Sequence, residues 1–398
     1  MRVLMVISQF HPMIGGAEKQ AQLLARKLVE LGIQVRIVTG RWKFGTLRRD
    51  RIDGIDVFRN FCCWGMFGVK GIRPLGAFIY MVTLSAYLLI HRREYDIIHV
   101  HQALYPAFVS VWVGNGILGK PVIVKTASSG MTSDIRQLKR FPLGRLQLGY
   151  LLKKMNCLVA VSKVSGREFI DVGYSESRIL YIPNGVAVPA QERRDYGQVR
   201  YVLTTSRLSR EKGVDVLLKA WAKVLQREQN LKLLILGDGP LASELFELSQ
   251  SLGSASSVKF NGFVHTVPEH LRASDLFVLP SRTEGMSNAL LEAMGYGIPC
   301  VATFVGGNDE VVKPNVSEIS TGKYVIGENG LLVNSDDVEA LSEAILYLVR
   351  NGAARERLGK RGRLFVQKYY SIESIAERYI QLYREFLNKK PRDMFRSR

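Results

Sequence analysis

The sequence predicts an α/β protein built from two doubly wound domains, each a mainly parallel sheet covered by helices on both faces. Two stretches, beginning near residues 2 and 201, open in the same order: an apolar strand, a turn or polar loop, an amphipathic helix and a second strand. The strands are nearly continuous apolar runs, which is typical of strands buried on both faces. With 398 residues, the chain is also long enough for two or three domains.

The first domain is expected to begin with a strand at Arg2–Gln9, followed by Gly15 and Gly16. A helix then follows, because apolar residues recur at the spacing of one helical face: Ala21, Leu24, Ala25 and Leu28. The next strand covers Gln34–Thr39. This order is that of a βαβ unit.

The second domain repeats the pattern with a strand at Tyr201–Ser206, a helix at Val214–Gln226 and a strand at Lys232–Leu236. Further along, Leu276–Leu279 has the pattern of a buried strand, and Asn288–Met294 that of a short helix ended by glycines. In such sheets, ligands bind beyond the carboxyl ends of the strands, so the loops at these ends are the places to search for chemistry.

A domain boundary is expected where Pro189–Gln198 is polar and lacks periodicity. We therefore divide the chain into a first domain at 1–190, a second domain at 191–370 and a C-terminal segment at 371–398. The last segment contains a long amphipathic helix, roughly Ser371–Leu387, which could pack back on the first domain.

The run Pro74–Ile90 contains no charged residue, which puts it at the lower limit of length for a membrane span. Polar residues interrupt the run, and a parallel sheet needs a crossover helix before the next strand, Asp96–His101. The sequence therefore predicts a buried or membrane-touching helix here and not a span.

Charge is distributed unevenly along the chain. Residues 1–190 contain 26 Lys and Arg against 11 Asp and Glu, whereas residues 191–398 contain 29 against 25. A basic first half favours an anionic partner such as nucleic acid, an anionic membrane surface or a phosphorylated substrate. The first apolar run is too short for a signal peptide, and the four cysteines lack metal-ligand spacing, so a reduced, cytoplasmic location is expected.

Two carboxylates, Glu284 and Glu292, flank the predicted start of the helix at Asn288. Free backbone amides at a helix N-terminus suit a phosphate, while carboxylates suit hydroxyl groups. A diphosphate flanked by two polyols, as in a nucleotide sugar, satisfies both. Arg207 and Lys212, at another strand–helix junction, could converge on one anion or could be a solvated pair.

Two further candidates come from the first domain. Gly15 and Gly16 follow the opening strand and either form a tight turn or let the backbone approach a phosphate. His101 lies at the carboxyl end of its strand and is either a substrate-facing group or a buried structural imidazole.

Taken together, these residues resemble the retaining family 4 glycosyltransferases of GT-B fold. The resemblance covers nearly the whole chain and is most specific at Glu284-Gly-(six residues)-Glu292, with Arg207-(four residues)-Lys212 before it. It implies a GT-B fold: two doubly wound Rossmann-like domains facing across a cleft, with a C-terminal helix crossing back to the first.

The same resemblance implies site roles. Arg207 and Lys212 would stabilise the leaving diphosphate without a metal, and no cofactor besides the UDP- or GDP-linked sugar is expected. Catalytic candidates are Arg207, Lys212, Glu284 and His101. The donor-binding set is Gly15, Gly16, Arg207, Lys212, Gly239, Val264, Glu284, Gly285, Met286, Ser287, Asn288 and Glu292.

One position departs from the family pattern. Many members carry a histidine where this chain has Ala127, after the strand Lys120–Val124. Acceptor-side candidates that could serve instead are Lys125, Ser128 and Asp134, besides His101. The departure leaves open a nucleotide-sugar-binding protein without transferase activity.

The family's acceptors are often lipid-linked glycans, and the segment from Arg136 to Lys154 alternates six basic residues with apolar ones. Such a segment suits the anionic inner face of a membrane, although an ordinary solvated helix face has the same composition. A nucleic-acid-binding protein is the remaining alternative, but the chain has no recognisable reading motif.

Overall fold

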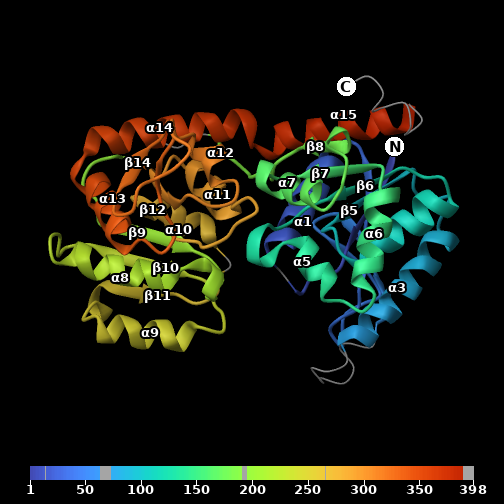
Figure 1. Ribbon diagram of the computed structural model, residues 1–398, viewed down its shortest axis with the longest axis horizontal. Helices are drawn as coiled ribbons and strands as arrows, with labels where there is room; N and C mark the ends of the chain where they lie inside the picture. The colour runs from blue at the N-terminus through green and yellow to red at the C-terminus, as the bar shows by residue number, and fades with distance from the viewer. Residues whose placement is uncertain (14, 63–72, 191–194, 265, 389–398) are drawn as a thin grey trace. The chain divides into compact units, whose positions relative to one another are not determined.

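The computed structural model describes residues 1–13, 15–62, 73–190, 195–264 and 266–388. It divides into two compact units (Figure 1). The first unit is Met1–Gly185 together with the C-terminal segment from Ile372, and the second unit is Val186–Ser371. The division falls five residues before the expected boundary at 190. The predicted basic tail, residues 389–398, lies outside the described residues.

The first unit is built on an eight-stranded sheet in the order β3-β4-β2-β1-β5-β6-β7-β8. Every neighbouring pair is parallel except β3 and β4. The strands are β1 (Arg2–Ile7), β2 (Gln34–Gly40), β3 (Arg49–Ile52), β4 (Ile55–Asn60), β5 (Ile97–His101), β6 (Val122–Lys125), β7 (Cys157–Ala160) and β8 (Ile179–Tyr181).

Helices cover both faces of this sheet, as the continuous apolar strands predict. Alternate residues of β1 face opposite cores: Leu4 and Val6 pack in one, Met5 and Ile7 in the other. The helical segments are α1 (Gly16–Glu30), α3 (Arg73–Ile90), α4 (Tyr105–Val109), the π-helical η2 (Ser110–Ile117), α5 (Asp134–Lys139), α6 (Gly144–Lys154), α7 (Lys163–Asp171) and α15 (Ile372–Asn388).

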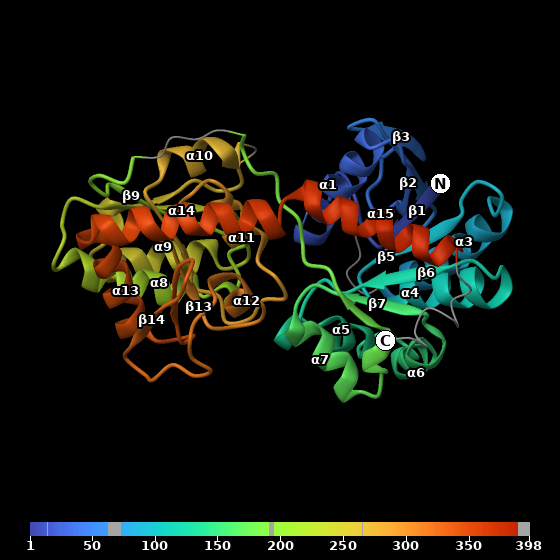
Figure 2. The same ribbon diagram turned by 90° about the horizontal axis from the view of Figure 1, so that it is seen from above.

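The last helix, α15, belongs to the first unit, as predicted, and Figure 2 shows it running across the strands of that sheet. Its buried face, which includes Tyr379, Tyr383 and Phe386, packs with α1 on the same side of the sheet. The Tyr383 hydroxyl lies 2.7 Å from Nδ1 of His99 on β5, so a polar contact fixes the register of the apolar packing.

The second unit is built on a seven-stranded sheet in the order β11-β10-β9-β12-β13-β15-β14, parallel except for β14 and β15. The strands are β9 (Tyr201–Thr205), β10 (Lys232–Leu236), β11 (Val258–Phe260), β12 (Leu276–Leu279), β13 (Cys300–Thr303), β14 (Tyr324–Ile326) and β15 (Leu331–Val333). Its helices are α8 (Val214–Leu225), α9 (Ala242–Ser251), α10 (Val267–Ala273), α11 (Asn288–Gly295), α12 (Asn308–Val312), α13 (Val338–Arg350) and α14 (Gly352–Tyr369).

The predicted helix at Pro74–Ile90 is α3, and it packs one face on the sheet through Tyr80, Leu84 and Leu88. No helix within the described ranges has the length and hydropathy of a membrane span. Phe78 and Val82, on the opposite face of α3, are exposed. The helix is therefore half buried, with an apolar outer face.

The predicted basic segment, Arg136 to Lys154, folds as two helices, α5 and α6. Leu138, Leu148 and Leu151 point into the core and are buried, while the basic side chains are exposed. Of its apolar residues, Leu143 and Leu146 stay open to solvent. Half of its six leucines therefore help to cover the sheet, while its basic side chains face solvent.

Candidate active site

The loops that follow β9 and β12 meet at the carboxyl end of the second sheet, where the sequence places most of the donor-binding residues. Arg282, after β12, donates from its backbone N–H to the carbonyl of Glu211, after β9, over 2.8 Å. Its guanidinium also binds the Asp215 carboxylate at the start of α8 through two bonds, of 2.8 and 2.7 Å. These bonds hold the two loops together.

Lys212 and Glu284 form an ion pair at this junction. The Lys212 Nζ lies 2.7 Å from Oε1 of Glu284, and the Ser281 hydroxyl donates to the same oxygen over 2.7 Å. The Glu284 side chain is 8% exposed and that of Lys212 is 24% exposed. The sequence predicts both residues for the site separately, and the structure brings them into direct contact.

The backbone of Glu284 is held by a glycine pair that sequence reasoning missed. Gly306, after β13, has φ of +59°, and a Cβ there would lie 2.0 Å from the Glu284 carbonyl oxygen. Gly307 donates its N–H to the carbonyl of Gly285 over 3.1 Å. A side chain at Gly306 would therefore displace the Glu284 loop. Only the glycine doublet in the sequence signalled this contact.

The remaining predicted residues of this loop lead into α11. Gly285, Met286 and Ser287 are buried, and the Ser287 hydroxyl accepts the N–H of Leu290 over 3.3 Å, which makes Ser287 the N-cap. Asn288 begins the helix, and Glu292 lies partly buried on its second turn. The spacing therefore puts Glu284 before the helix N-terminus and Glu292 beyond it, as predicted.

Arg207 and Gly239 lie in the loops that follow β9 and β10. Arg207 is exposed, five positions before Lys212. Leu208 donates its N–H to the Asp238 carbonyl over 3.0 Å, and a Cβ on Gly239 would come within 2.3 Å of the Leu208 carbonyl oxygen. The close packing of the two loops thus explains why position 239 is a glycine. Val264 lies partly buried after β11.

In the first unit, Gly15 and Gly16 stand exposed at the start of α1, with Gly15 as the N-cap. The structure adds Glu18, whose carboxylate accepts the backbone N–H groups of Gly15 and of Glu18 itself. Burial raises the pKa of the Glu18 carboxyl, and these hydrogen bonds oppose the rise. A carboxylate thus occupies the helix N-terminus where the sequence predicts a phosphate.

Asp134 organises the loops after β5 and β6. Its carboxylate accepts the N–H of Ala127 over 2.9 Å, the N–H of Ala103 over 3.2 Å and the hydroxyl of Ser128 over 3.1 Å. Burial raises the pKa of this carboxyl to about 6 in spite of these bonds. Among the acceptor-side candidates, Asp134 and Ser128 thus lie together beside Ala127.

The proposal that His101 faces the substrate is corrected by its burial. His101 is 2% exposed and stacks on His99 with ring centroids 4.4 Å apart, on the sheet face that α15 covers. Burial lowers the pKa of both imidazoles. His101 is therefore the buried structural imidazole that was the second alternative, because α15, the last helix of the chain, covers this face of the sheet.

Lys125 lies on the same face, at the end of β6, and is 4% exposed. Its Nζ is 5.9 Å from the centroid of the Tyr379 ring, and burial lowers the pKa of the amine from 10.5 to about 7. An amine with this pKa can exchange a proton near neutrality.

Replacing Lys125 by methionine is expected to raise the free energy of unfolding by on the order of 1–3 kcal/mol near pH 8. Between pH 7 and 10.5 the unfolded chain binds a proton at Lys125 that the folded chain does not bind, so stability rises with pH across this window. Thermal unfolding near pH 7.5 and 9.5 should therefore show a gain for Lys125→Met that shrinks at the higher pH. A gain independent of pH would contradict the low pKa.

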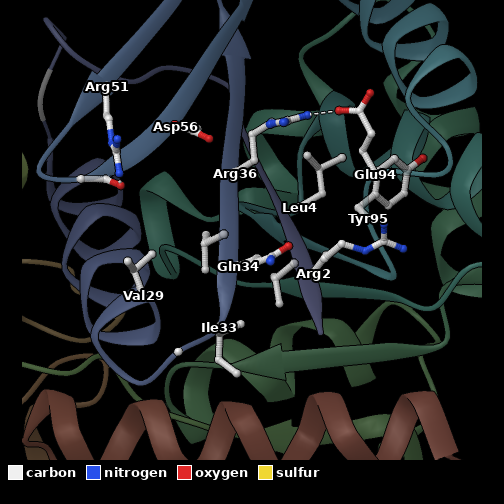
Figure 3. A pocket seen from close by; sticks show the side chains of 14 residues that line it. Arg2, Leu4, Val29, Ile33, Gln34, Arg36, Arg51, Asp56, Glu94 and Tyr95 are labelled. Carbon is white, nitrogen blue, oxygen red and sulfur yellow. Dashed lines mark hydrogen bonds and ion pairs between the residues drawn. The ribbon is translucent and has the colours of Figure 1, made fainter.

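A pocket of about 370 Å³ lies elsewhere, at the amino ends of β1 and β2 (Figure 3). Two of the arginines in its wall form ion pairs: Arg36 with Glu94, and Arg2 with Asp96. Because ligands of parallel sheets bind at the carboxyl ends, this pocket is not the candidate site. Within the described residues, no cluster of His, Cys, Asp and Glu could hold a metal ion.

Comparison with known families covers both units. The family described as Glycosyltransferase Family 4 matches residues 14–188, and that described as Glycosyl transferases group 1 matches residues 190–365. The chain belongs to the family 4 glycosyltransferases. The two matches follow each other in order and meet near the division between the units.

Relatives of this glycosyltransferase include the N-acetyl-alpha-D-glucosaminyl L-malate synthase of Bacillus anthracis, 24% identical over 95% of this chain and 96% of the relative. A GDP-mannose-dependent monoacylated alpha-(1-6)-phosphatidylinositol monomannoside mannosyltransferase of Corynebacterium glutamicum is 28% identical over 63% of this chain and 67% of its own length.

Solved structures agree on the fold. Alr3699/HepE of Anabaena in complex with UDP-glucose superposes with a TM-score of 0.74 at 18% identity, over 97% of this chain and 100% of that one. A sucrose-phosphate synthase of Thermosynechococcus elongatus gives 0.75 at 22% identity, over 98% and 100%. The predicted GT-B fold with two Rossmann-like units is thereby confirmed.

Proposed function

We propose that this glycosyltransferase moves a sugar from a nucleotide-sugar donor to an acceptor hydroxyl with retention of configuration and without a metal ion. The observation that carries the proposal is the Lys212–Glu284 ion pair beside the N-terminus of α11. It puts a cation, a carboxylate and helix amides at one carboxyl end of the sheet, where a charged, hydroxyl-rich ligand would bind. Two comparison proteins are named for such donors, UDP-glucose and GDP-mannose.

Binding of the donor would replace the contact between Lys212 and Glu284 by contacts of each side chain with the donor. The diphosphate would take Lys212 from Glu284 and be bound also by Arg207 and by the amides of Gly285 to Asn288. Glu284 would turn its carboxylate to sugar hydroxyls, and Glu292 would accept the ribose hydroxyls. The ion pair would thus keep both groups in position while the site is without donor.

In the reaction, the bond between the anomeric carbon and the diphosphate oxygen breaks while the acceptor oxygen bonds to that carbon on the same face. The acceptor proton passes to the departing phosphate oxygen. Positive charge on Arg207 and Lys212 stabilises the diphosphate as negative charge develops on it, which is the role that a divalent metal fills in other enzymes.

In the first unit, the amides of Gly15 and Gly16 would become open to an anionic group of a ligand once it displaces the Glu18 carboxylate from the N-terminus of α1. Asp134 and Ser128 would shape the place that a histidine fills in many relatives. The acceptor we propose is a glycan or lipid-linked glycan, used in polysaccharide, lipopolysaccharide or glycolipid assembly at the inner face of a membrane.

A panel of UDP-, GDP- and ADP-sugars tests the proposal. We expect one donor to raise the thermal unfolding midpoint and to be hydrolysed slowly without acceptor, at a rate unchanged by EDTA. Stabilisation with no turnover on any acceptor would indicate a binding protein instead. No response to any donor, with salt-dependent binding of DNA or RNA, would indicate a nucleic-acid-binding protein.

A further inference from the structure

The outer face of α3 is an apolar surface that no described part of the chain covers. Its exposed residues are all apolar, and each lies three or four positions from another member of the set: Leu75, Phe78, Val82, Ala86, Leu89 and Ile90. Phe78 is 62% exposed and Ile90 is 73% exposed. At 1.5 Å per residue the 18-residue helix is roughly 27 Å long, so this apolar face is continuous over most of that length.

Neighbouring elements extend this apolar face. The segment η2 contacts α3, and α6 in turn contacts η2. On η2, Trp112 and Ile117 are exposed, and at the start of α6 so are Leu143 and Leu146. All three elements pack on the same side of the first sheet, so their outer sides form a common layer.

Basic side chains border the layer. Arg92 and Arg93 follow α3 and are exposed, as are Lys153 and Lys154 at the end of α6. The Asn115 side chain of η2 donates to the Lys154 carbonyl over 3.1 Å, which places that end of α6 against η2. Residues 75–154 contain 10 Lys and Arg, of which Lys125 is buried, against 3 Asp and Glu.

The three acidic residues do not offset this charge. Asp134 is buried, Glu94 pairs with Arg36 and Asp96 pairs with Arg2. A symmetric dimer through this surface would bring one basic border against another, because a two-fold interface pairs a patch with itself. An anionic lipid surface has the opposite charge and accepts apolar side chains below its headgroups.

We infer that the layer formed by α3, η2 and α6 is the surface on which this protein docks to an anionic phospholipid bilayer, with the apolar face of α3 inserted. This inference rests on the proposed function in one respect, namely that the acceptor is linked to a lipid of the same bilayer. Docking here would hold the first unit at the surface through a helix that is part of its core, so insertion needs no refolding. The insertion is that of a helix lying at the interface and not of a span.

The test uses the purified full chain and sedimentation with vesicles of phosphatidylcholine and phosphatidylglycerol, about 7:3, at low salt. Replacing both exposed residues, Phe78→Asn with Val82→Asn, should lower the partition coefficient on the order of tenfold. The matched control is Leu364→Asn, because Leu364 is 65% exposed on α14 of the second unit. It should leave partitioning at the wild-type value.

A charge variant, Arg92→Gln with Arg93→Gln, should weaken binding to these vesicles, and added salt should weaken wild-type binding. Wild-type partitioning of the Phe78→Asn, Val82→Asn variant would overturn the inference. The inference would also be overturned if the wild type is a dimer, the variant is a monomer, and the two bind the vesicles equally. Donor hydrolysis without vesicles should be equal in all these variants, so a failure of docking is separable from a failure of the proposed chemistry.

Discussion

Replacing Lys212 by alanine is expected to lower the rate of sugar transfer by on the order of 10²–10³. The amine is held 2.7 Å from Glu284, at the end of the second sheet where the diphosphate would lie. Its loss would remove a positive charge from the position where negative charge develops in the transition state. Initial transfer rates at saturating donor, with the donor identified by the panel, measure the effect.

Lys223→Ala is the matched control for this prediction. Lys223 also pairs with a glutamate, Glu339, at 2.6 Å, but on the exposed outer side of α8, where an ion pair contributes about 0–1 kcal/mol. Its replacement should leave the rate unchanged. Equal rates for wild type and Lys212→Ala would remove Lys212 from the catalytic role.

Glu284→Gln is expected to reduce kcat/KM for the donor by roughly 10- to 100-fold, since a hydrogen bond to a charged group contributes about 1.5–3 kcal/mol. Glutamine keeps the shape of the side chain but removes the charge that positions Lys212 and that, in the proposed function, accepts donor hydroxyls. Steady-state kinetics with varied donor measure the loss, and Glu339→Gln is the control from the exposed pair.

The two variants together should show whether the pair acts as a unit. Because Lys212 and Glu284 are in contact, their effects should not add: the double variant should lose less than the product of the two single losses. Strictly multiplicative losses would mean that the two side chains act independently, contrary to the arrangement in the structure.

Much of the fold could be predicted because local signals and long-range order agree. The strands Lys232–Leu236 and Leu276–Leu279 are observed where predicted, since Gly237 and Pro280 end the two apolar runs. The helix Asn288–Met294 is longer by one residue, because Gly295 still completes the last turn. The return of α15 to the first unit was also predicted, from its position after a completed second domain.

What the sequence could not supply are contacts between segments far apart in the chain. Lys212 and Glu284 are separated by 72 positions, and their pairing depends on the order of β9 and β12 in the sheet. His101 is buried because α15 covers its side of the sheet, and no local pattern around a histidine shows this. The Gly306 contact likewise depends on how the loop after β13 returns to Glu284.

The apolar composition of α3 was visible in the sequence, but its division into a buried and an open face was not. A helix with apolar residues all round can be covered on every side or on one. Packing on a single sheet decides between the two, and here it leaves Phe78 and Val82 outside.

The central claim is that the end of the second sheet around Lys212 and Glu284 binds the donor. Calorimetric titration of the donor identified by the panel into wild type and into the Lys212→Ala, Glu284→Gln double variant tests it most directly. We predict saturable binding at one site in the wild type and none detectable in the double variant at the same concentrations. Equal affinity in the two proteins would contradict the account.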